Sequence, residues 1–422
     1  MPNAAQPTAL APLPGDFNPR DYLLLHPDLI EFNVDPVWHY MNHGHAEHRT
    51  YRREKPALVY SLRVTGSLGD ALMAARLARD LHTAVPENAI FDIFSQRPEA
   101  VEFLYQAIPG FRACLPDRHF QGAVSRIYDF ALTVTQFVSL DHLAADAPLS
   151  EASPTKEILR HLLREQRKIQ KYITESPGLD GAFANFATRQ GLNRRSHPHA
   201  MLGIPYGGDG LSLCNFPDPP LECRLGEKPY LTIHDDWDLA IAPDAPHSTR
   251  SLPIDTWKTI IEQIKIQAPD IKIVQLGEQP GPVLPGVDVD LKGQLTFHQS
   301  ISILARSLLH IDTDSSLVHA ATSQGVRCVV LFGPTNPEWV GYPQNVNVAP
   351  TRCGNCWFLS ANWLTDCPAG LARPVCTGAD SLGPTRVTAE VRAALSEAAT
   401  HILPVVDIQT TRDREKNENI HL

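Results

Sequence analysis

The chain has 422 residues, of which 43% are hydrophobic and 20% are charged, so it is long and apolar enough for two core-forming domains and is not disordered as a whole. Its formal net charge of −10 argues against a nucleic-acid-binding protein, because such proteins present a basic face to the phosphates. The sequence has neither a secretion-signal pattern at its start nor an apolar run near the roughly 18 residues that span a bilayer, so we expect a cytoplasmic protein.

The first 52 residues differ in composition from the rest of the chain. Residues 1–16 are rich in Pro and Ala and are expected to form a flexible lead-in. In residues 17–52, apolar side chains are spaced for two short helices joined near Pro36, which predicts a small helical module. This module resembles a short appendage that bacterial glycosyltransferases and other proteins carry. Its histidines could bind a metal, but surface packing is the favoured interpretation for His39, His43, His45 and His48.

After this module, short β-branched segments alternate with helical segments. Residues 57–94 have the order strand, loop, helix, strand, which is a βαβ unit and predicts a parallel sheet. The same rhythm restarts after a loop-like stretch at residues 203–226. We therefore predict an α/β protein with an N-terminal lobe over 53–225, a C-terminal lobe over 226–404, a last helix over 387–400 and a polar tail over 405–422.

One predicted helix, over residues 155–173, carries more basic than acidic side chains. Its apolar residues fall on one face and leave the bases mostly on the other. A solvated surface is the simpler interpretation. The alternative is that this face meets an anionic acceptor or an anionic membrane surface.

The segment 309–335 reads as strand, loop, helix, strand, with Asp314 and Ser315 where the helix begins. Ser and Asp favour helix N-caps, and the amides of a first helical turn form an anion site that fits a diphosphate. In an open α/β sheet, ligands bind beyond the carboxyl ends of the strands, where this loop lies. Capped helices occur in any α/β protein, so the capping pattern alone does not decide the function.

This segment, HIDTDSSLVHAATSQGVRCVVLFGPTNP, resembles the signature of the ADP-heptose:lipopolysaccharide heptosyltransferase family. The resemblance implies the GT-B fold, with two Rossmann-like lobes and a cleft between them. It also implies inverting transfer of a heptose, or a related sugar, from an ADP-sugar to an acceptor hydroxyl without a catalytic cofactor. Ser315 and Ser316 replace the family's Thr-Gly, which leaves the identity of the sugar open. The implied donor-binding positions in this segment are Asp314, Ser315, Ser316, His319, Gly333, Pro334 and Thr335.

Other segments agree with the family in order and spacing. Arg250 stands near the family's usual lysine, where a guanidinium would hold a phosphate by a forked contact. The strand and turn at 271–281 place Gly277 and Glu278 near the adenosine. The acidic segment 235–238 is interpreted as a loop and not as a metal site.

In the first lobe, VTGSLGDALMAARLARDL resembles the family's Gly-Asp motif, with Gly69 and Asp70 at its two positions. The resemblance implies that Asp70 is the general base for the acceptor hydroxyl, which suits a carboxylate within hydrogen-bond reach of an alcohol. The alternative is that Asp70 only caps its helix. Arg63 and Ser67 lie just upstream and are expected to orient the acceptor.

Four of the eight cysteines fall within a short segment, as CGNC followed by two single cysteines. Thiolates in this spacing favour a structural zinc or iron, and members of the resembled family carry cysteines here, with iron in the autotransporter protein heptosyltransferases. The alternative is four reduced thiols or a disulfide pair. The predicted metal ligands are Cys353, Cys356, Cys367 and Cys376.

Three functions remain open at this level. The favoured one is a glycosyltransferase whose acceptor is a lipopolysaccharide core sugar or a surface protein. The others are a sugar-nucleotide epimerase of the same fold and a non-catalytic scaffold that binds a sugar nucleotide. A peripheral contact with an anionic membrane and a homo-oligomer are both compatible with the sequence, and no nucleic-acid partner is expected.

Overall fold

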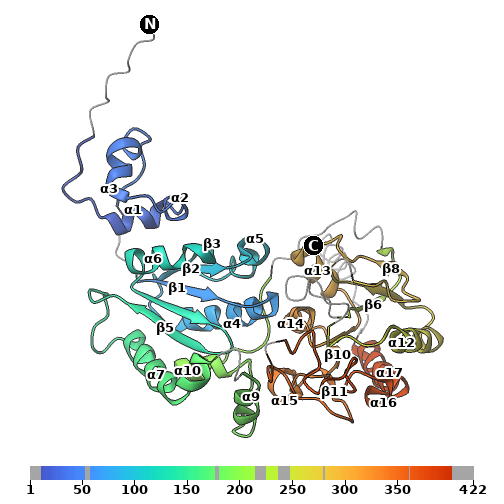
Figure 1. Cartoon of the computed structure of the whole chain (residues 1–422). Helices are drawn as coiled ribbons and strands as arrows, with labels where there is room; N and C mark the ends of the chain where they lie inside the picture. The colour runs from blue at the N-terminus through green and yellow to red at the C-terminus, as the bar shows by residue number, and fades with distance from the viewer. Residues whose placement is uncertain are drawn as a thin grey trace, which may run out of the picture.

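The computed structural model describes residues 11–52, 58–175, 180–213, 225–235, 248–278, 281–360 and 362–401. Most of the lead-in, most of the acidic loop at 235–238 and the tail at 405–422 lie outside these residues. The described chain forms two α/β lobes side by side, with a small helical module on the first lobe (Figure 1). The predicted α/β class and the two lobes are therefore confirmed.

The first lobe is built on a five-stranded sheet in the order β3-β2-β1-β4-β5. All neighbouring pairs are parallel except β4 and β5, which form an antiparallel edge. Alternate residues of β1 serve two cores, because Tyr60, Leu62 and Val64 pack in one cluster and Val59 in another. The strands are β1 (Val59–Val64), β2 (Ile90–Ser95), β3 (Phe111–Pro116), β4 (Phe130–Val134) and β5 (Val138–Leu143).

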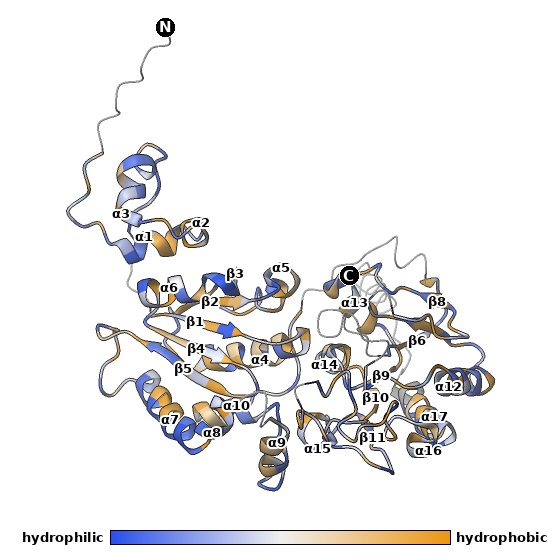
Figure 2. Cartoon of the chain, viewed as in Figure 1, coloured by the Kyte–Doolittle hydropathy of each residue, from blue (hydrophilic) through white to orange (hydrophobic). Residues whose placement is uncertain are grey.

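The second lobe is built on a fully parallel six-stranded sheet in the order β11-β10-β9-β6-β7-β8. The four residues of β6, of β9 and of β10 are all buried, as expected for central strands with helices on both faces. In the hydropathy colouring of Figure 2, β6 (YLTI) and β10 (CVVL) are mostly apolar, whereas β9 (HIDT) is mostly polar. The strands are β6 (Tyr230–Ile233), β7 (Lys272–Gln275), β8 (Val289–Asp290), β9 (His310–Thr313), β10 (Cys328–Leu331) and β11 (Val346–Val348).

Helices connect and cover the strands of each lobe (Figure 1). In the first lobe they are α4 (Leu68–Ala84), α5 (Pro98–Val101), η2 (Glu102–Leu104), η3 (Asp117–His119), α6 (Phe120–Ile127), α7 (Pro154–Lys168), α8 (Gln170–Thr174), α9 (Asp180–Thr188) and α10 (His197–Leu202). In the second they are α12 (Ile254–Gln267), α13 (Phe297–Leu304), α14 (Ser316–Ser323), α15 (Pro337–Val340), α16 (Ala379–Leu382) and α17 (Pro384–His401). The last helix thus starts three residues before the predicted one, because a proline fits its first turn.

The N-terminal module contains more elements than the two predicted helices. It consists of α1 (Pro19–Leu25), α2 (Asp28–Glu31), α3 (Pro36–His39) and the π-helical turn η1 (Tyr40–Gly44). Pro36 begins α3, with Asp35 accepting a hydrogen bond from the Trp38 amide as its cap. The module is anchored to the first lobe, because Arg20 pairs with Asp129 at 2.7 Å. It also shares a hydrophobic cluster with the α6 side of the first sheet.

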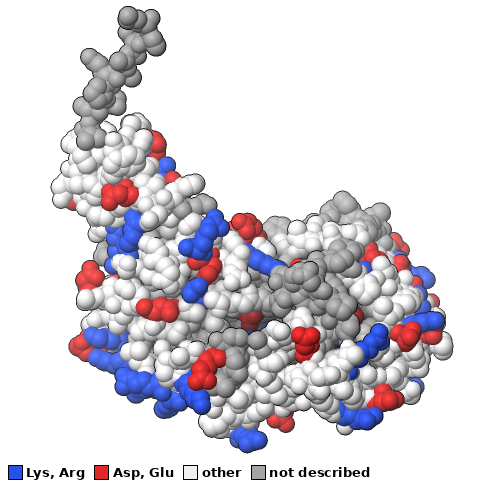
Figure 3. Space-filling model, viewed as in Figure 1, with Lys and Arg blue, Asp and Glu red and all other residues white. Residues whose placement is uncertain are grey.

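The basic segment forms two helices, α7 and α8, where one was predicted, because the backbone leaves helical geometry at Ile169. Most of its bases have carboxylate partners, as the solvated-surface interpretation expects, and Figure 3 shows both signs of charge on this face. The pairs are Lys156–Glu151, Arg160–Glu151, Arg164–Glu157 and Lys168–Glu165. Contact with an anionic surface stays a prediction. Across the described residues, no helix has the length and hydrophobicity required to cross a bilayer.

Candidate active site

The predicted acceptor-side and donor-side residues meet where α4 of the first lobe packs on α14 of the second. A Cβ atom placed on Gly69 would lie 2.8 Å from Cδ2 of His319 and 3.5 Å from Cα of Ser316. Carbon atoms in contact normally lie about 3.5–4.0 Å apart. Only glycine therefore lets the two helices approach this closely, which explains the Gly of the Gly-Asp motif.

Asp70 caps its own helix. Its Oδ2 accepts hydrogen bonds from the Ser67 amide at 2.7 Å and from the Ser67 hydroxyl at 3.2 Å. Its Oδ1 accepts a hydrogen bond from Arg194, and this ion pair is mostly buried. A carboxylate offers about four lone-pair sites, so these contacts leave it able to accept a proton. The role of Asp70 as a base stays a prediction.

The first turn of α14 has the predicted cap. Ser315 is the N-cap residue, and its hydroxyl oxygen accepts a hydrogen bond from the Leu317 amide at 3.1 Å. Arg250 reaches this loop from the second lobe, because its Nη1 donates to the Asp314 carbonyl at 2.6 Å. The Arg250 guanidinium also lies over the Trp363 ring, 5.8 Å from its centre. One cation and the positive end of a helix are thereby placed side by side.

A buried polar network lies next to Ser315, the N-cap residue of α14. Asp312 is fully buried, and its carboxylate accepts hydrogen bonds from Nδ1 of His234 at 2.9 Å, from Nε2 of His310 at 3.0 Å and from the Ser315 hydroxyl. Burial raises the pKa of Asp312, but the two histidines outweigh it and lower that pKa to about 2. Thr232 completes the network by bonding Nδ1 of His310 at 2.9 Å.

His319 is held in the interface between the lobes. Its Nδ1 lies 2.7 Å from the hydroxyl of Tyr342, and Nη2 of Arg76 on α4 donates to its carbonyl at 3.3 Å. Burial, followed by the charges of Arg76 and three other arginines, holds the pKa of His319 well below its usual range. The imidazole is therefore neutral at physiological pH.

The remaining donor-side positions lie around this centre. A Cβ on Gly277 would approach Cδ2 of His234 to 2.9 Å, and the backbone φ of +134° also favours glycine there. Glu278 faces the first lobe, where Nη1 of Arg97 is 3.6 Å from its Oε1. Arg63 lies on the α6 side of the first sheet, because it forms a two-pronged pair with Asp117 at 2.6 and 3.0 Å. The adenosine role of Gly277 and Glu278 and the acceptor role of Arg63 stay predictions.

The loop that contains Gly333, Pro334 and Thr335 packs against the cysteine segment. A Cβ on Gly333 would meet the Thr377 methyl at 2.7 Å, and the Trp357 amide donates to the Pro334 carbonyl at 2.9 Å. The same tryptophan lies under Arg194, with the guanidinium 5.8 Å from its ring centre. The cysteine segment, residues 353–376, therefore packs against both the loop at 333–335 and Arg194, the arginine that pairs with Asp70.

Comparisons with known proteins agree with this arrangement. Residues 227–356 match the sequence model of glycosyltransferase family 9 (heptosyltransferase). The match lies within the second lobe and ends at Cys356. No curated protein sequence matches the chain. The solved structure of the iron-containing dodecameric glycosyltransferase TibC from enterotoxigenic E. coli covers 84% of this chain and 84% of its own, at 15% identity and a TM-score of 0.53.

E. coli ADP-heptose lps heptosyltransferase II covers 81% of this chain and 99% of its own, at 14% identity and a TM-score of 0.49. At 15% identity, the similarity to TibC establishes the fold. The predicted GT-B fold is thus confirmed, and the match to the family model confirms the predicted glycosyltransferase class.

The four clustered cysteines of this glycosyltransferase are close enough to affect one another. Burial, then the charges of neighbouring cysteines, raise the pKa values of Cys356 and Cys376, the latter to about 12. The donor set suits a thiophilic metal. Within the described part of the chain, however, no group of three or more Cys, His, Asp or Glu side chains has an arrangement that could hold a metal ion. The predicted zinc or iron site stays a prediction.

Several residues of the glycosyltransferase site were not anticipated from the sequence. His310 and Asp312 alternate along β9, a pattern that places both on one face of the strand and could have signalled a buried polar pair. Arg194 follows Asn193 in a segment with no recognisable motif. Arg76 and Tyr342 come from distant helices and loops, and no local pattern connects them.

Proposed function

We propose that this glycosyltransferase transfers a heptose, or a related sugar, from an ADP-sugar to an acceptor hydroxyl, with inversion at the anomeric carbon. The observation that carries the proposal is the packing of α4 on α14. It brings the Gly69–Asp70 pair of the first lobe against His319 and the capped helix end of the second, with His319 Cδ2 only 2.8 Å from a Cβ on Gly69. TibC, whose fold this chain shares, has been determined in complex with ADP-D-beta-D-heptose.

In the proposed reaction, the acceptor oxygen forms a bond to the anomeric carbon from one side as the bond from that carbon to the diphosphate oxygen breaks on the other. Asp70 takes the acceptor proton, and ADP leaves with the electron pair of the broken bond. Arg250 and the first-turn amides of α14 stabilise the charge that develops on the diphosphate. Proton removal and stabilisation of the leaving group are thus both performed by groups of this chain.

The substitution Asp70→Asn separates the base from the cap. Asparagine keeps an oxygen for the Ser67 amide, which lies 2.7 Å from the present carboxylate, but it cannot accept the acceptor proton and loses the ion pair with Arg194. We expect the donor Kd to be retained and the transfer rate to fall by about 10²-fold or more. The control Asp255→Asn removes another first-turn carboxylate, on α12, and should leave both values unchanged. Normal transfer by Asp70→Asn would reduce Asp70 to a cap.

The proposal includes a surface glycan or a surface protein as acceptor and a homo-oligomer as the working form. TibC is described as dodecameric. Light scattering of the purified chain measures the oligomeric state. Transfer to a lipopolysaccharide core and to a serine-rich surface protein, assayed side by side, distinguishes the two acceptor classes.

The structural iron or zinc at the four cysteines remains a separate prediction. It is checked by the metal content of the purified protein against that of Cys353→Ser. Loss of bound metal in the variant supports the four-thiolate site. Equal metal content in both proteins, or none in either, contradicts it.

A further inference from the structure

His319 lies among charged and polar groups from several elements. Four arginines act on its ring, Arg76 from α4, Arg194 and Arg195 from the segment before α10, and Arg250 from the second lobe. Tyr342 lies directly beside it, with the two ring centres 5.5 Å apart. Burial and these four arginines are the largest influences on its pKa, and all of them lower it. A second proton on this ring is therefore strongly disfavoured, and the question is which nitrogen carries the first.

The hydrogen bonds around Tyr342 have a direction. Nη1 of Arg76 donates to the Tyr342 hydroxyl oxygen at 2.7 Å. Because a guanidinium can only donate, the tyrosine oxygen accepts there and keeps its own hydrogen for another partner. Nδ1 of His319 lies 2.7 Å from the same oxygen. The tyrosine hydrogen thus points to Nδ1, which must then be the unprotonated nitrogen.

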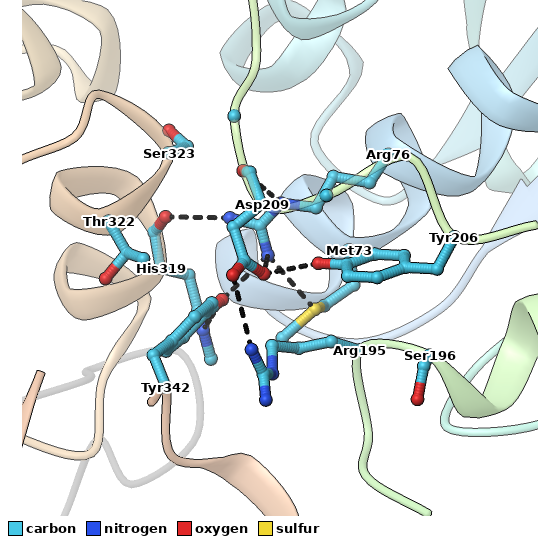
Figure 4. Close-up of polar contacts among 12 residues, drawn as sticks. Met73, Arg76, Arg195, Ser196, Tyr206, Asp209, His319, Thr322, Ser323 and Tyr342 are labelled. Carbon is cyan, nitrogen blue, oxygen red and sulfur yellow. Dashed lines mark hydrogen bonds and ion pairs between the residues drawn. The ribbon is translucent and has the colours of Figure 1, made fainter. Parts of the chain in front are cut away.

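Figure 4 shows Arg76 and Tyr342 pointing toward one another from the two lobes, with His319 beside Tyr342. The other polar contacts in this view involve Arg76 or Asp209 and not the ring of His319. Nε of Arg76 donates to the Asp209 carbonyl at 2.8 Å, and Arg76 is 1% exposed. Tyr206 donates to the Asp209 carboxylate. The hydrogen bonds that link Arg76 to Tyr342 and Tyr342 to His319 are therefore separate from those around Asp209.

We propose that Arg76 and Tyr342 are positioning residues that hold His319 in one neutral tautomer, with its proton on Nε2. This nitrogen lies on the side of the ring that faces α4, since a Cβ on Gly69 would be 3.5 Å from it. His319 thereby presents an N–H donor where the first lobe meets the donor loop. The tautomer itself depends only on this chain, while its use for an oxygen of the donor rests on the proposed function.

The arrangement also couples the two lobes. Arg76 lies six residues after Asp70 on α4, so the helix that carries the proposed base also carries the group that orients Tyr342. The histidine tautomer is thus fixed only while α4 and α14 are packed together. Nε2 of His319 can therefore donate a hydrogen bond to a ligand when Asp70 is in place.

The tautomer can be measured without any ligand or substrate. Nitrogen-15 histidine spectra of the wild-type chain, with the His319 signal assigned by its loss in His319→Gln, should show unprotonated Nδ1 and protonated Nε2 from pH 5 to pH 8. In Tyr342→Phe the signal should move toward a mixture of tautomers. A protonated Nδ1 in the wild type, or a tautomer unchanged in a folded Tyr342→Phe, would overturn the proposal.

The consequence for binding is tested by calorimetric titration with ADP-heptose. Tyr342→Phe should weaken binding about tenfold, the size of one buried hydrogen bond left unmade. Tyr206→Phe removes a hydroxyl from the same cluster without touching His319 and should bind as the wild type does. Equal weakening in both variants would contradict the positioning role. If the wild type does not bind ADP-heptose at all, the proposed function fails, while the spectra still decide the tautomer.

Discussion

At the scale of single residues, the contact between α4 and α14 depends on the absence of a side chain at Gly69. A methyl group there would meet His319 at 2.8 Å, well inside normal contact distance. The helix itself would gain from alanine, because glycine is unfavourable in helices by about 1 kcal/mol. The cost of a substitution therefore falls on the interface and not on the helix.

Gly69→Ala should accordingly keep the free energy of unfolding near the wild-type value and weaken the binding of the sugar-nucleotide donor by about tenfold. Gly122→Ala, on α6, is the matched control, because its nearest neighbouring atom would lie 3.8 Å from the new methyl group. The control should bind donor normally. Normal binding by Gly69→Ala would show that this close contact is unimportant for the site.

Asp312, which bonds to the N-cap residue of α14, makes the stability of the protein depend on pH in the acid range. Its folded-state pKa is lowered to about 2, with burial opposing and His234 and His310 favouring the ionised form. A lowered carboxyl pKa contributes stability above the unfolded value of about 3.9 that is lost as the pH falls toward about 2. Asp312→Asn should lower the free energy of unfolding at neutral pH by about 3–5 kcal/mol, since it breaks a buried pair. The free energy of unfolding of this variant, measured by urea unfolding, should also change less with pH between pH 4 and pH 2. An unchanged slope would contradict the assignment.

At the scale of elements, the first turn of α14 has two functions, one structural and one for the donor. Ser315→Ala removes the cap, which should cost about 1 kcal/mol of stability, and the hydrogen bond to the Asp312 carboxylate, which should cost about 2 kcal/mol more. Thr296→Ala removes the equivalent cap of α13, where the hydroxyl accepts from the Gln299 amide at 3.2 Å, and should cost only about 1 kcal/mol. Only Ser315→Ala should also weaken donor binding, by about tenfold. Equal donor binding in the two variants would remove the α14 turn from the site.

The elements were predictable to the extent that their signals are local. The strand and helix rhythm predicted both lobes, and Ser315 was identified as a cap from the residues that follow it. The break at Ile169 was missed, because apolar residues continue in helical spacing across it. The partners of Asp70 and His319 were also missed. Arg194 is 124 residues from Asp70 in sequence, and Tyr342 is 266 residues from Arg76, so only the folded chain brings them together.

At the scale of the whole molecule, the two lobes form one continuous hydrophobic cluster, which contains Leu77 and Val134 of the first lobe and Leu317 and Val330 of the second. Polar contacts cross the same interface. The Arg194 amide donates to the Trp339 carbonyl at 2.9 Å, and the Asn355 side chain donates to Asn185 at 2.8 Å. The donor loop, the proposed base and the cysteine segment are therefore joined in one packed unit.

The most direct test of this account is calorimetric titration of the full chain with ADP-heptose, a UDP-sugar and a GDP-sugar under the same conditions. The account predicts saturable heat and a raised melting temperature with ADP-heptose and neither effect with the other two sugar nucleotides. Binding of a UDP-sugar together with no response to ADP-heptose would contradict it.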